Sequence, residues 1–355
     1  MAPIACECSD VSFKVAAAAQ NTVFTNPPDP QNKTAIIDFF NASFSPPGVA
    51  TNGTQAVSGV YTINGVYCKP RVSCLKQQTL QILIHGLGYN KTMWSGSGEG
   101  DQYSWQKPAN AKGYHTLAID RLSHGSNPQH PDPLTVVQGQ LHVEIAHQII
   151  SAIRSNARNN PLGQGFSKIV VVGHSYGSGT GALLAALHPT DIDALILTGY
   201  SSAINPGTFT YLPASTVFPQ RFSSLAPGYL TWALASEHEA AFFAGAYDKA
   251  VALRDFQGTD TAALGELVEP TFFVGAVATA YTKPVLIVTG ELDALGCTTP
   301  IAACEARLAV IKEWKFPNAS NFEYYIPKQT GHDFWLHYSN PTTVKKVHEY
   351  LGRFF

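Results

Sequence analysis

The chain has 355 residues and a net charge of −2, and only 14% of its residues are charged. This charged share lies well below the roughly 25% of typical soluble domains and has no basic excess, which argues against a nucleic-acid partner. Hydrophobic residues make up 45% of the chain, enough for a sizeable core, but the apolar runs are too short for a membrane-spanning helix. The length predicts one large domain that carries an insertion.

The cysteines form three couples that are close in sequence: Cys6 with Cys8, Cys68 with Cys74, and Cys297 with Cys304. No couple has the C-x-x-C spacing and no histidine stands at zinc-finger spacing from one, so we expect disulfides and no structural metal. Asn-x-Ser/Thr sequons occur at Asn32, Asn41, Asn52, Asn90 and Asn318. These features favour a secreted protein with two or three disulfides, although the first residues show no signal peptide. The alternative is a cytosolic enzyme with free thiols.

Residues 1–59 are expected to form an arm that packs on the core. They are rich in Pro, Asn and Thr, as in FTNPPDPQNKT and SFSPPGVATNGT, which is typical of turns and surface loops. From Val60 onward, two short strands are predicted about the Asn64-Gly65 dipeptide, because this dipeptide is a strong hairpin signal.

Short apolar runs alternate with helical patterns through residues 60–200 and 283–355. The predicted buried strands are 80–84, 115–119, 169–172, 194–197, 285–288 and 322–326. The predicted helices are 143–158, 179–187 and 342–354. Alternation of this kind indicates an α/β core, with a mainly parallel central sheet flanked by helices.

Residues 201–282 interrupt the alternation and are predicted to form a largely helical cap insertion. Helices are expected around 237–254 and 261–280, with Pro270 ending or bending the second. The insertion is rich in aromatic residues. We expect most of them to form its own small core and a few to face a cleft above the sheet.

The sharpest motif is Gly173-His174-Ser175-Tyr176-Gly177, which follows a predicted buried strand and precedes a predicted helix. A tight strand-to-helix turn there would strain the backbone at the serine and expose its hydroxyl at the carboxyl edge of the sheet. Glycines two residues before and after are needed because side chains there would collide with neighbouring backbone.

With this motif in its context, the sequence resembles an α/β-hydrolase fold enzyme of the serine esterase or lipase kind. The segment His85-Gly86-Leu87-Gly88, at the end of a predicted strand, resembles the HG-x-G oxyanion loop of that family. The resemblance implies that the backbone N–H groups of Leu87 and Tyr176 hold the oxyanion. A plain tight glycine turn is the other interpretation of this segment.

The family order of catalytic residues is serine, acid, histidine. Asp293 and His332 each follow a predicted strand, so they reach the same sheet edge as Ser175. The resemblance makes His332 the general base and Asp293 the group that orients it, with Glu291 as the rival acid. Asp120, after an earlier strand, resembles a structural turn residue of this fold.

These features predict a secreted serine hydrolase that cleaves ester or lactone bonds of an apolar or aromatic small molecule through an acyl-enzyme. No metal, nucleotide or other cofactor is implied, and the oligomeric state is left open. Three alternatives stand beside this prediction: a C–C bond hydrolase or other triad chemistry on the same fold, a ligand-binding protein with little turnover, and a structural or adhesion protein.

Overall fold

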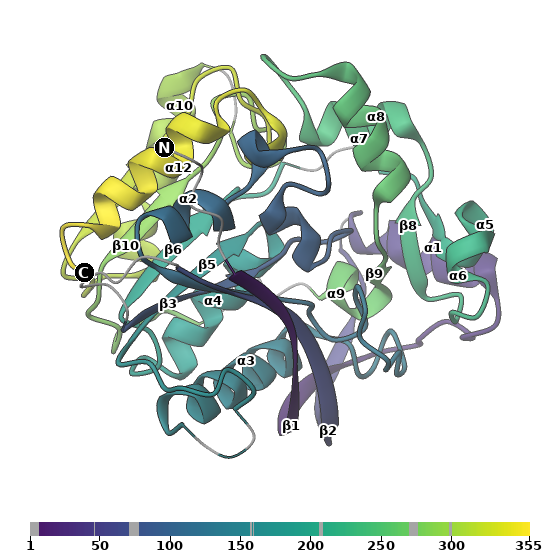
Figure 1. Ribbon diagram of the computed structural model, residues 1–355. Helices are drawn as coiled ribbons and strands as arrows, with labels where there is room; N and C mark the ends of the chain where they lie inside the picture. Colours follow the sequence, from purple (N-terminus) through teal and green to yellow (C-terminus); the bar gives the residue numbers. More distant parts are fainter. Residues whose placement is uncertain are drawn as a thin grey trace.

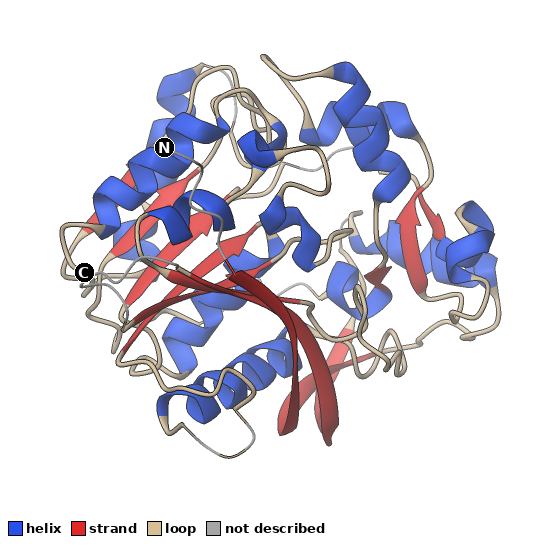
Figure 2. Ribbon diagram, viewed as in Figure 1, coloured by secondary structure: helices blue, strands red, loops and turns tan. Residues whose placement is uncertain are grey.

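The computed structural model describes residues 7–45, 47–70, 78–156, 158, 160–205, 209–269, 276–297 and 300–355. In these residues an eight-stranded sheet has the order β1-β2-β4-β3-β5-β6-β10-β11 (Figure 1 and Figure 2). Its strands are β1 (Glu7–Phe24), β2 (Thr51–Lys69), β3 (Thr79–Ile84), β4 (His115–Ile119), β5 (Lys168–His174), β6 (Ala194–Thr198), β10 (Val285–Val288) and β11 (Phe322–Tyr325). From β4 to β11 all neighbours are parallel, which confirms a mainly parallel sheet, whereas β2 is antiparallel to both β1 and β4.

Helices cover both faces of this sheet, because successive side chains of a strand point to opposite sides. The described helices of the core are α2 (Gln106–Ala111), α3 (Gly139–Arg154), α4 (Tyr176–Leu187), α10 (Ile301–Ala309), α11 (Ile311–Lys315) and α12 (Asn340–Leu351), with the 3₁₀ turns η1 (Lys91–Ser95), η2 (Asp101–Tyr103) and η3 (Phe334–Leu336). Val171 packs among side chains of α3 and α4, while its neighbours Val170 and Val172 pack among those of α2 and α12. The six predicted strands and three predicted helices are all present, with shifts of a few residues at their ends.

The prediction of loops over residues 1–59 is wrong. The segment contains the long strand β1, the helix α1 (Lys33–Ser43) and the first part of β2. In β1 the side chains of Phe13, Val15 and Ala17 are buried while those between them are exposed, which is the alternation of a strand with one covered face. Figure 1 shows β1 and β2 as a long curved ribbon at the edge of the sheet.

No hairpin turn forms at Asn64-Gly65, so that prediction is also wrong. The strand β2 continues through both residues and pairs along its length with β1, Ser12 facing Asn64 and Val11 facing Gly65. A Cβ on Gly65 would lie 2.8 Å from the carbonyl oxygen of Ala118 in β4. The glycine therefore permits close approach of two strands, a role that a local turn signal cannot distinguish from a bend.

Between β6 and β10 the described residues form helices and a second, three-stranded antiparallel sheet, β7-β8-β9. The elements are β7 (Tyr211–Pro213), α5 (Ala214–Val217), α6 (Pro219–Phe222), β8 (Tyr229–Trp232), α7 (Ala235–Phe242), α8 (Lys249–Gly258), β9 (Ala262–Ala263) and α9 (Leu264–Val268). The helix expected over 237–254 is divided at Gly245, which has a φ of 81° and where a Cβ would lie 2.6 Å from the backbone of Gln329. Of the helix expected over 261–280, only α9 forms among the described residues, and Pro270 lies outside them.

Two disulfides lie in the described part of the chain. Cys8 pairs with Cys68 across β1 and β2, and Cys297 pairs with Cys304. Cys6 and Cys74 lie outside the described residues. None of the helices described is long and apolar enough to span a membrane.

Candidate active site

Ser175 lies at the sharp turn between β5 and α4, with a φ of 52° and a ψ of −114°. A positive φ is strained for a residue that carries a Cβ. A Cβ on Gly173 would lie 2.3 Å from the carbonyl oxygen of Gly177, and a Cβ on Gly177 would lie 2.1 Å from that of Ile84. Side chains cannot be accommodated at either glycine, which is the steric requirement expected from the motif.

His332 and Asp293 form a hydrogen-bonded pair. The Nδ1 atom of His332 lies 2.8 Å from Oδ2 of Asp293, and the carboxylate is fully buried. Its other oxygen accepts hydrogen bonds from the backbone N–H groups of Leu295 and Gly296, both at 2.9 Å. These contacts fix the carboxylate and require the proton of a neutral His332 to be on Nδ1, so that Nε2 carries a lone pair.

The Nε2 atom of His332 is buried and has no hydrogen-bond partner. His332 and Ser175 line the same pocket, and the ring of Phe242 stacks on the imidazole with centroids 5.5 Å apart. The structure thus brings together the three residues that the sequence analysis selected, from the ends of β5, β10 and β11.

Glu291, the rival acid, points elsewhere. Its Oε2 atom accepts a hydrogen bond from the backbone N–H of Gln329 at 2.9 Å. Asp120 is a buried turn residue, as expected, because its carboxylate accepts hydrogen bonds from the backbone N–H groups of Lys91 and Ser126. Neither carboxylate is hydrogen-bonded to His332.

The segment His85-Gly86-Leu87-Gly88 follows β3 and packs against the turn at Ser175. A Cβ on Gly86 would lie 3.2 Å from the Cβ of Ser175, and Leu87 lines the pocket. Tyr176, the first residue of α4, follows Ser175 directly. The two residues assigned to the oxyanion by resemblance therefore both lie beside Ser175.

The pocket at Ser175 has a volume of about 630 Å³ and a mainly apolar lining. Its aromatic side chains come from three parts of the chain and are Phe40, Phe44, Tyr89, Phe209, Tyr211, Trp232 and Phe242. The sequence analysis expected some aromatic residues of the segment 201–282 here, but it missed Phe40 of α1 and Phe44, which follows that helix. The spacing of the buried residues Ile36 and Phe40 is the helical signal that could have indicated α1.

A pair of buried carboxyl groups also went unrecognised in the sequence. The hydroxyl of Tyr89 donates to Asp255 of α8 at 2.7 Å and also contacts Asp333, the residue after His332. Burial raises the pKa of Asp255 to about 7, and burial together with the neighbouring Asp255 raises the pKa of Asp333 well above its usual range. Nothing in the sequence indicates that residues so far apart would meet.

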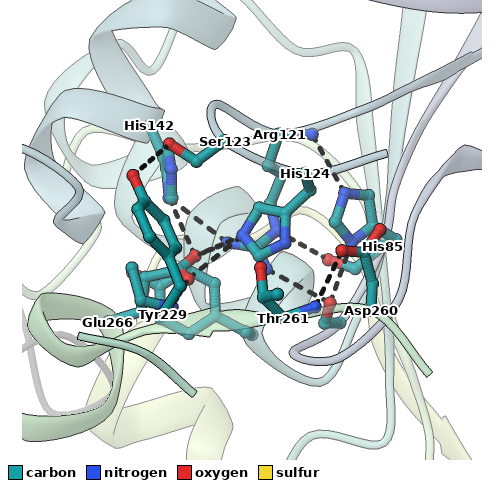
Figure 3. A network of polar contacts seen from close by, with 12 residues as sticks. His85, Arg121, Ser123, His124, His142, Tyr229, Asp260, Thr261 and Glu266 are labelled. Atoms are coloured by element: carbon teal, nitrogen blue, oxygen red, sulfur yellow. Dashed lines mark hydrogen bonds and ion pairs between the residues drawn. The ribbon is translucent and has the colours of Figure 1, made fainter. Parts of the chain in front are cut away.

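A second buried network joins the core to α9, as Figure 3 shows. The guanidinium of Arg121 pairs with Glu266, and Nε2 of His124 lies 3.1 Å from both oxygens of the same carboxylate. Burial raises the pKa of Glu266, but the Arg121 charge and His124 outweigh it and hold that pKa well below its usual range. Glu266 is therefore a carboxylate at neutral pH, compensated inside the protein.

Among the described residues, one group offers donors that could hold a metal ion: His147, His188 and Asp191. The two imidazole rings are stacked, with centroids 3.8 Å apart and planes within 9° of parallel. A lone pair of imidazole lies in the ring plane, so two parallel rings cannot direct theirs at one ion. As arranged, the group forms two hydrogen-bonded pairs, His147 with Asp191 and His188 with Glu144.

The comparisons with solved structures agree with the fold. A monoacylglycerol lipase from Paleococcus ferrophilus superposes with a TM-score of 0.53 and 19% identity over 78% of this chain and 94% of that one. A putative aryl esterase from Burkholderia cenocepacia superposes with a TM-score of 0.52 and 16% identity, over 82% of this chain and 96% of that one. A thermophilic esterase from Thermogutta terrifontis has a TM-score of 0.53 and 14% identity, over 82% of this chain and 94% of that one.

No curated protein matches the sequence significantly. The model of the alpha/beta hydrolase family, however, matches residues 81–347, which is most of the chain. That range extends from β3 to α12 and includes the serine turn, the buried carboxylate and the histidine. The chain belongs to the alpha/beta hydrolase family.

Proposed function

We propose that the protein is a serine hydrolase that cleaves carboxylic esters or lactones through an acyl-enzyme. The observation that carries this proposal is the shared pocket of Ser175 and His332, in which Nε2 of His332 is unpartnered while its Nδ1 is held by Asp293. A serine hydroxyl needs such a base to become nucleophilic.

In the proposed reaction the Ser175 oxygen attacks the carbonyl carbon of the substrate while Nε2 of His332 takes the hydroxyl proton. The backbone N–H groups of Leu87 and Tyr176 hold the oxyanion of the tetrahedral intermediate. His332 then gives the proton to the leaving oxygen, which yields the acyl-enzyme. Water, deprotonated by His332, attacks the acyl carbon, and the acid leaves as the proton returns to Ser175. Asp293 keeps the imidazole in its reactive tautomer and stabilises the imidazolium.

The lining of the pocket supports an apolar or aromatic small molecule as substrate. Aromatic side chains surround a volume of about 630 Å³, enough for a ligand of ordinary small-molecule size. Segment 201–282 is proposed to act as a cap and residues 1–59 as an arm, since both contribute to this lining. The two disulfides support the secretory route as the place where the protein matures.

The test is a panel of p-nitrophenyl esters of increasing acyl length, together with lactones, assayed with wild type and Ser175→Ala. Wild type should turn over part of the panel and be labelled by a fluorophosphonate, and Ser175→Ala should lose both. Ser178→Ala is the matched control, because it removes a buried hydroxyl of the same helix that bonds only to the carbonyl of Thr198. Labelling that persists in Ser175→Ala would refute the nucleophile, and equal ligand binding by both proteins without product would favour the binding-protein alternative.

A further inference from the structure

The peptide group between Gly86 and Leu87 is held by hydrogen bonds on its carbonyl side. The carbonyl oxygen of Gly86 lies 3.2 Å from Nη2 of Arg121 and 2.8 Å from Nδ1 of His85. In a planar trans peptide the C=O and the N–H point in opposite directions. Donors that fix the Gly86 oxygen therefore also fix the direction of the Leu87 N–H, the group expected to bind the oxyanion.

The tautomer of His85 follows from its second contact. Its Nε2 atom accepts a hydrogen bond from the backbone N–H of Arg121 at 2.9 Å, so the ring proton is on Nδ1 and is donated to Gly86. Burial and the Arg121 charge lower the pKa of His85 well below its usual range, which keeps the ring neutral. Arg121 thus acts on this peptide directly through its guanidinium and indirectly through the imidazole.

Arg121 also contacts the other side of the site. Its guanidinium lies over the ring of Tyr176, 4.4 Å from the centroid, and its Nε donates to the carbonyl oxygen of His85 at 3.1 Å. The ion pair with Glu266, seen in Figure 3, neutralises its charge and holds the guanidinium in place. The side chain of Arg121 therefore contacts Gly86, whose carbonyl belongs to the peptide group that carries the Leu87 N–H, and Tyr176, which carries the other expected oxyanion donor.

We propose that Arg121 is a positioning residue of the oxyanion hole: its planar fork, supported by His85, orients the Leu87 N–H toward the oxygen of the tetrahedral intermediate. This inference rests on the proposed function. A lysine cannot replace the arginine, since an ammonium on a flexible chain does not present two fixed donors to two carbonyl oxygens. The effect should be larger on the transition state than on substrate binding, because the oxyanion forms only during the reaction.

The experiment compares wild type, Arg121→Lys and the double variant Arg121→Met/Glu266→Gln, the last because Arg121→Met alone would leave Glu266 charged, buried and unpaired. In both variants we expect kcat for a p-nitrophenyl ester to fall by about 10- to 100-fold, with KM within about twofold of wild type. The loss should be smaller than the roughly 100- to 1,000-fold cost of removing an oxyanion donor, because the Leu87 N–H is still present but no longer fixed in direction. Affinity for a trifluoromethyl ketone, which forms a tetrahedral oxyanion with Ser175, should fall by the same factor. Far-UV circular dichroism and melting temperature report the folded fraction.

Arg154→Lys is the matched control, because Arg154 also donates to a backbone carbonyl, that of Asp191, and pairs with Asp193, whereas the donors of Arg121 hold the carbonyl oxygens of His85 and Gly86. Its kcat should equal that of wild type. The inference is overturned if folded Arg121→Lys keeps wild-type kcat and ketone affinity, or if its KM rises while kcat stays constant. Such results would leave the proposed function intact, whereas an inactive wild type or an active Ser175→Ala would remove it.

Discussion

The carboxyl groups of Asp255 and Asp333 lie together in the interior, and the hydroxyl of Tyr89 contacts both of them. Asp255 comes from the proposed cap and Asp333 follows His332 directly. The groups that face them are two buried imidazoles, His174 at 3.6 Å from Asp333 and His238 at 3.6 Å from Asp255. Burial lowers the pKa of both histidines, so the pair has no full positive charge beside it and retains a proton.

This pair should make stability depend on pH. Because the pKa of Asp255 is raised to about 7 in the folded state, the folded protein keeps a proton that the unfolded chain loses near its ordinary pKa of about 4. The contribution to stability is complete below pH 4 and is lost as the pH rises to 7, with a slope of about 1.4 kcal/mol per pH unit per proton. Urea unfolding at several pH values should show this decline as the difference between wild type and Asp255→Asn, because the lowered pKa values of buried histidines such as His174 and His238 act on both proteins with the opposite sign.

In Asp255→Asn the decline should be shallower, since an amide does not titrate. Part of the slope should remain, because burial also raises the pKa of Asp333 well above its usual range and that of Glu269 to about 7, with the same sign. Glu269→Gln serves as a comparison and should remove a separate part of the slope. Equal slopes in wild type and Asp255→Asn would contradict the assignment of the raised pKa.

Substitution of the proposed acid should separate it from its rival. Asp293→Asn should lower kcat by about 10³- to 10⁴-fold with little change in KM, because an amide no longer holds the imidazole in the reactive tautomer. Glu291→Gln should leave both constants unchanged, since Gln can still accept the hydrogen bond from Gln329. Steady-state kinetics on one ester measures both, and more than a tenth of wild-type kcat in Asp293→Asn would count against the triad.

The arm should influence the choice of substrate. Phe44 of the arm lines the pocket although it is 46% exposed, so Phe44→Ala removes apolar surface at its rim. We expect kcat/KM to fall by about 3- to 10-fold for p-nitrophenyl octanoate and to change little for the acetate, which is too short to reach the rim. Tyr338→Ala is the control, a 61% exposed aromatic side chain outside the pocket. Equal losses for both esters would argue against a pocket role of the arm.

The two disulfides should stabilise the fold unequally. Cys8 and Cys68 are 60 residues apart, and Cys297 and Cys304 are 7 apart. Loop-closure entropy gives about 4 kcal/mol for the longer loop and about 2 to 3 kcal/mol for the shorter. Double Cys→Ser variants in urea should follow this order, and a non-reducing peptide map should show both links. Free thiols at all four positions in the purified protein would contradict the pairing.

Local sequence determined the features that depend on neighbours along the chain. The buried parallel strands could be predicted because both faces are covered, which requires continuous apolar runs such as residues 169–172. The turn at Ser175 could be predicted because the motif is five residues long and lies between a predicted strand and a predicted helix, and because Gly173 leaves no room for a side chain against Gly177 of the same motif. The order of Ser175, Asp293 and His332 then placed them at one sheet edge, since parallel strands end on the same side.

Tertiary structure alone decided which distant segments meet. The local sequence at Gly65 predicts a turn, yet in the structure Gly65 lies in β2 beside the backbone of β4. The break between α7 and α8 lies at Gly245, where a side chain would collide with the backbone of the distant Gln329. The meeting of Asp255 with Asp333, and of Phe44 with the pocket of Ser175, likewise depends on packing between elements far apart in sequence. Periodicity and turn signals report only on neighbouring residues, whereas these contacts arise when the arm, the core and segment 201–282 close over a common interior.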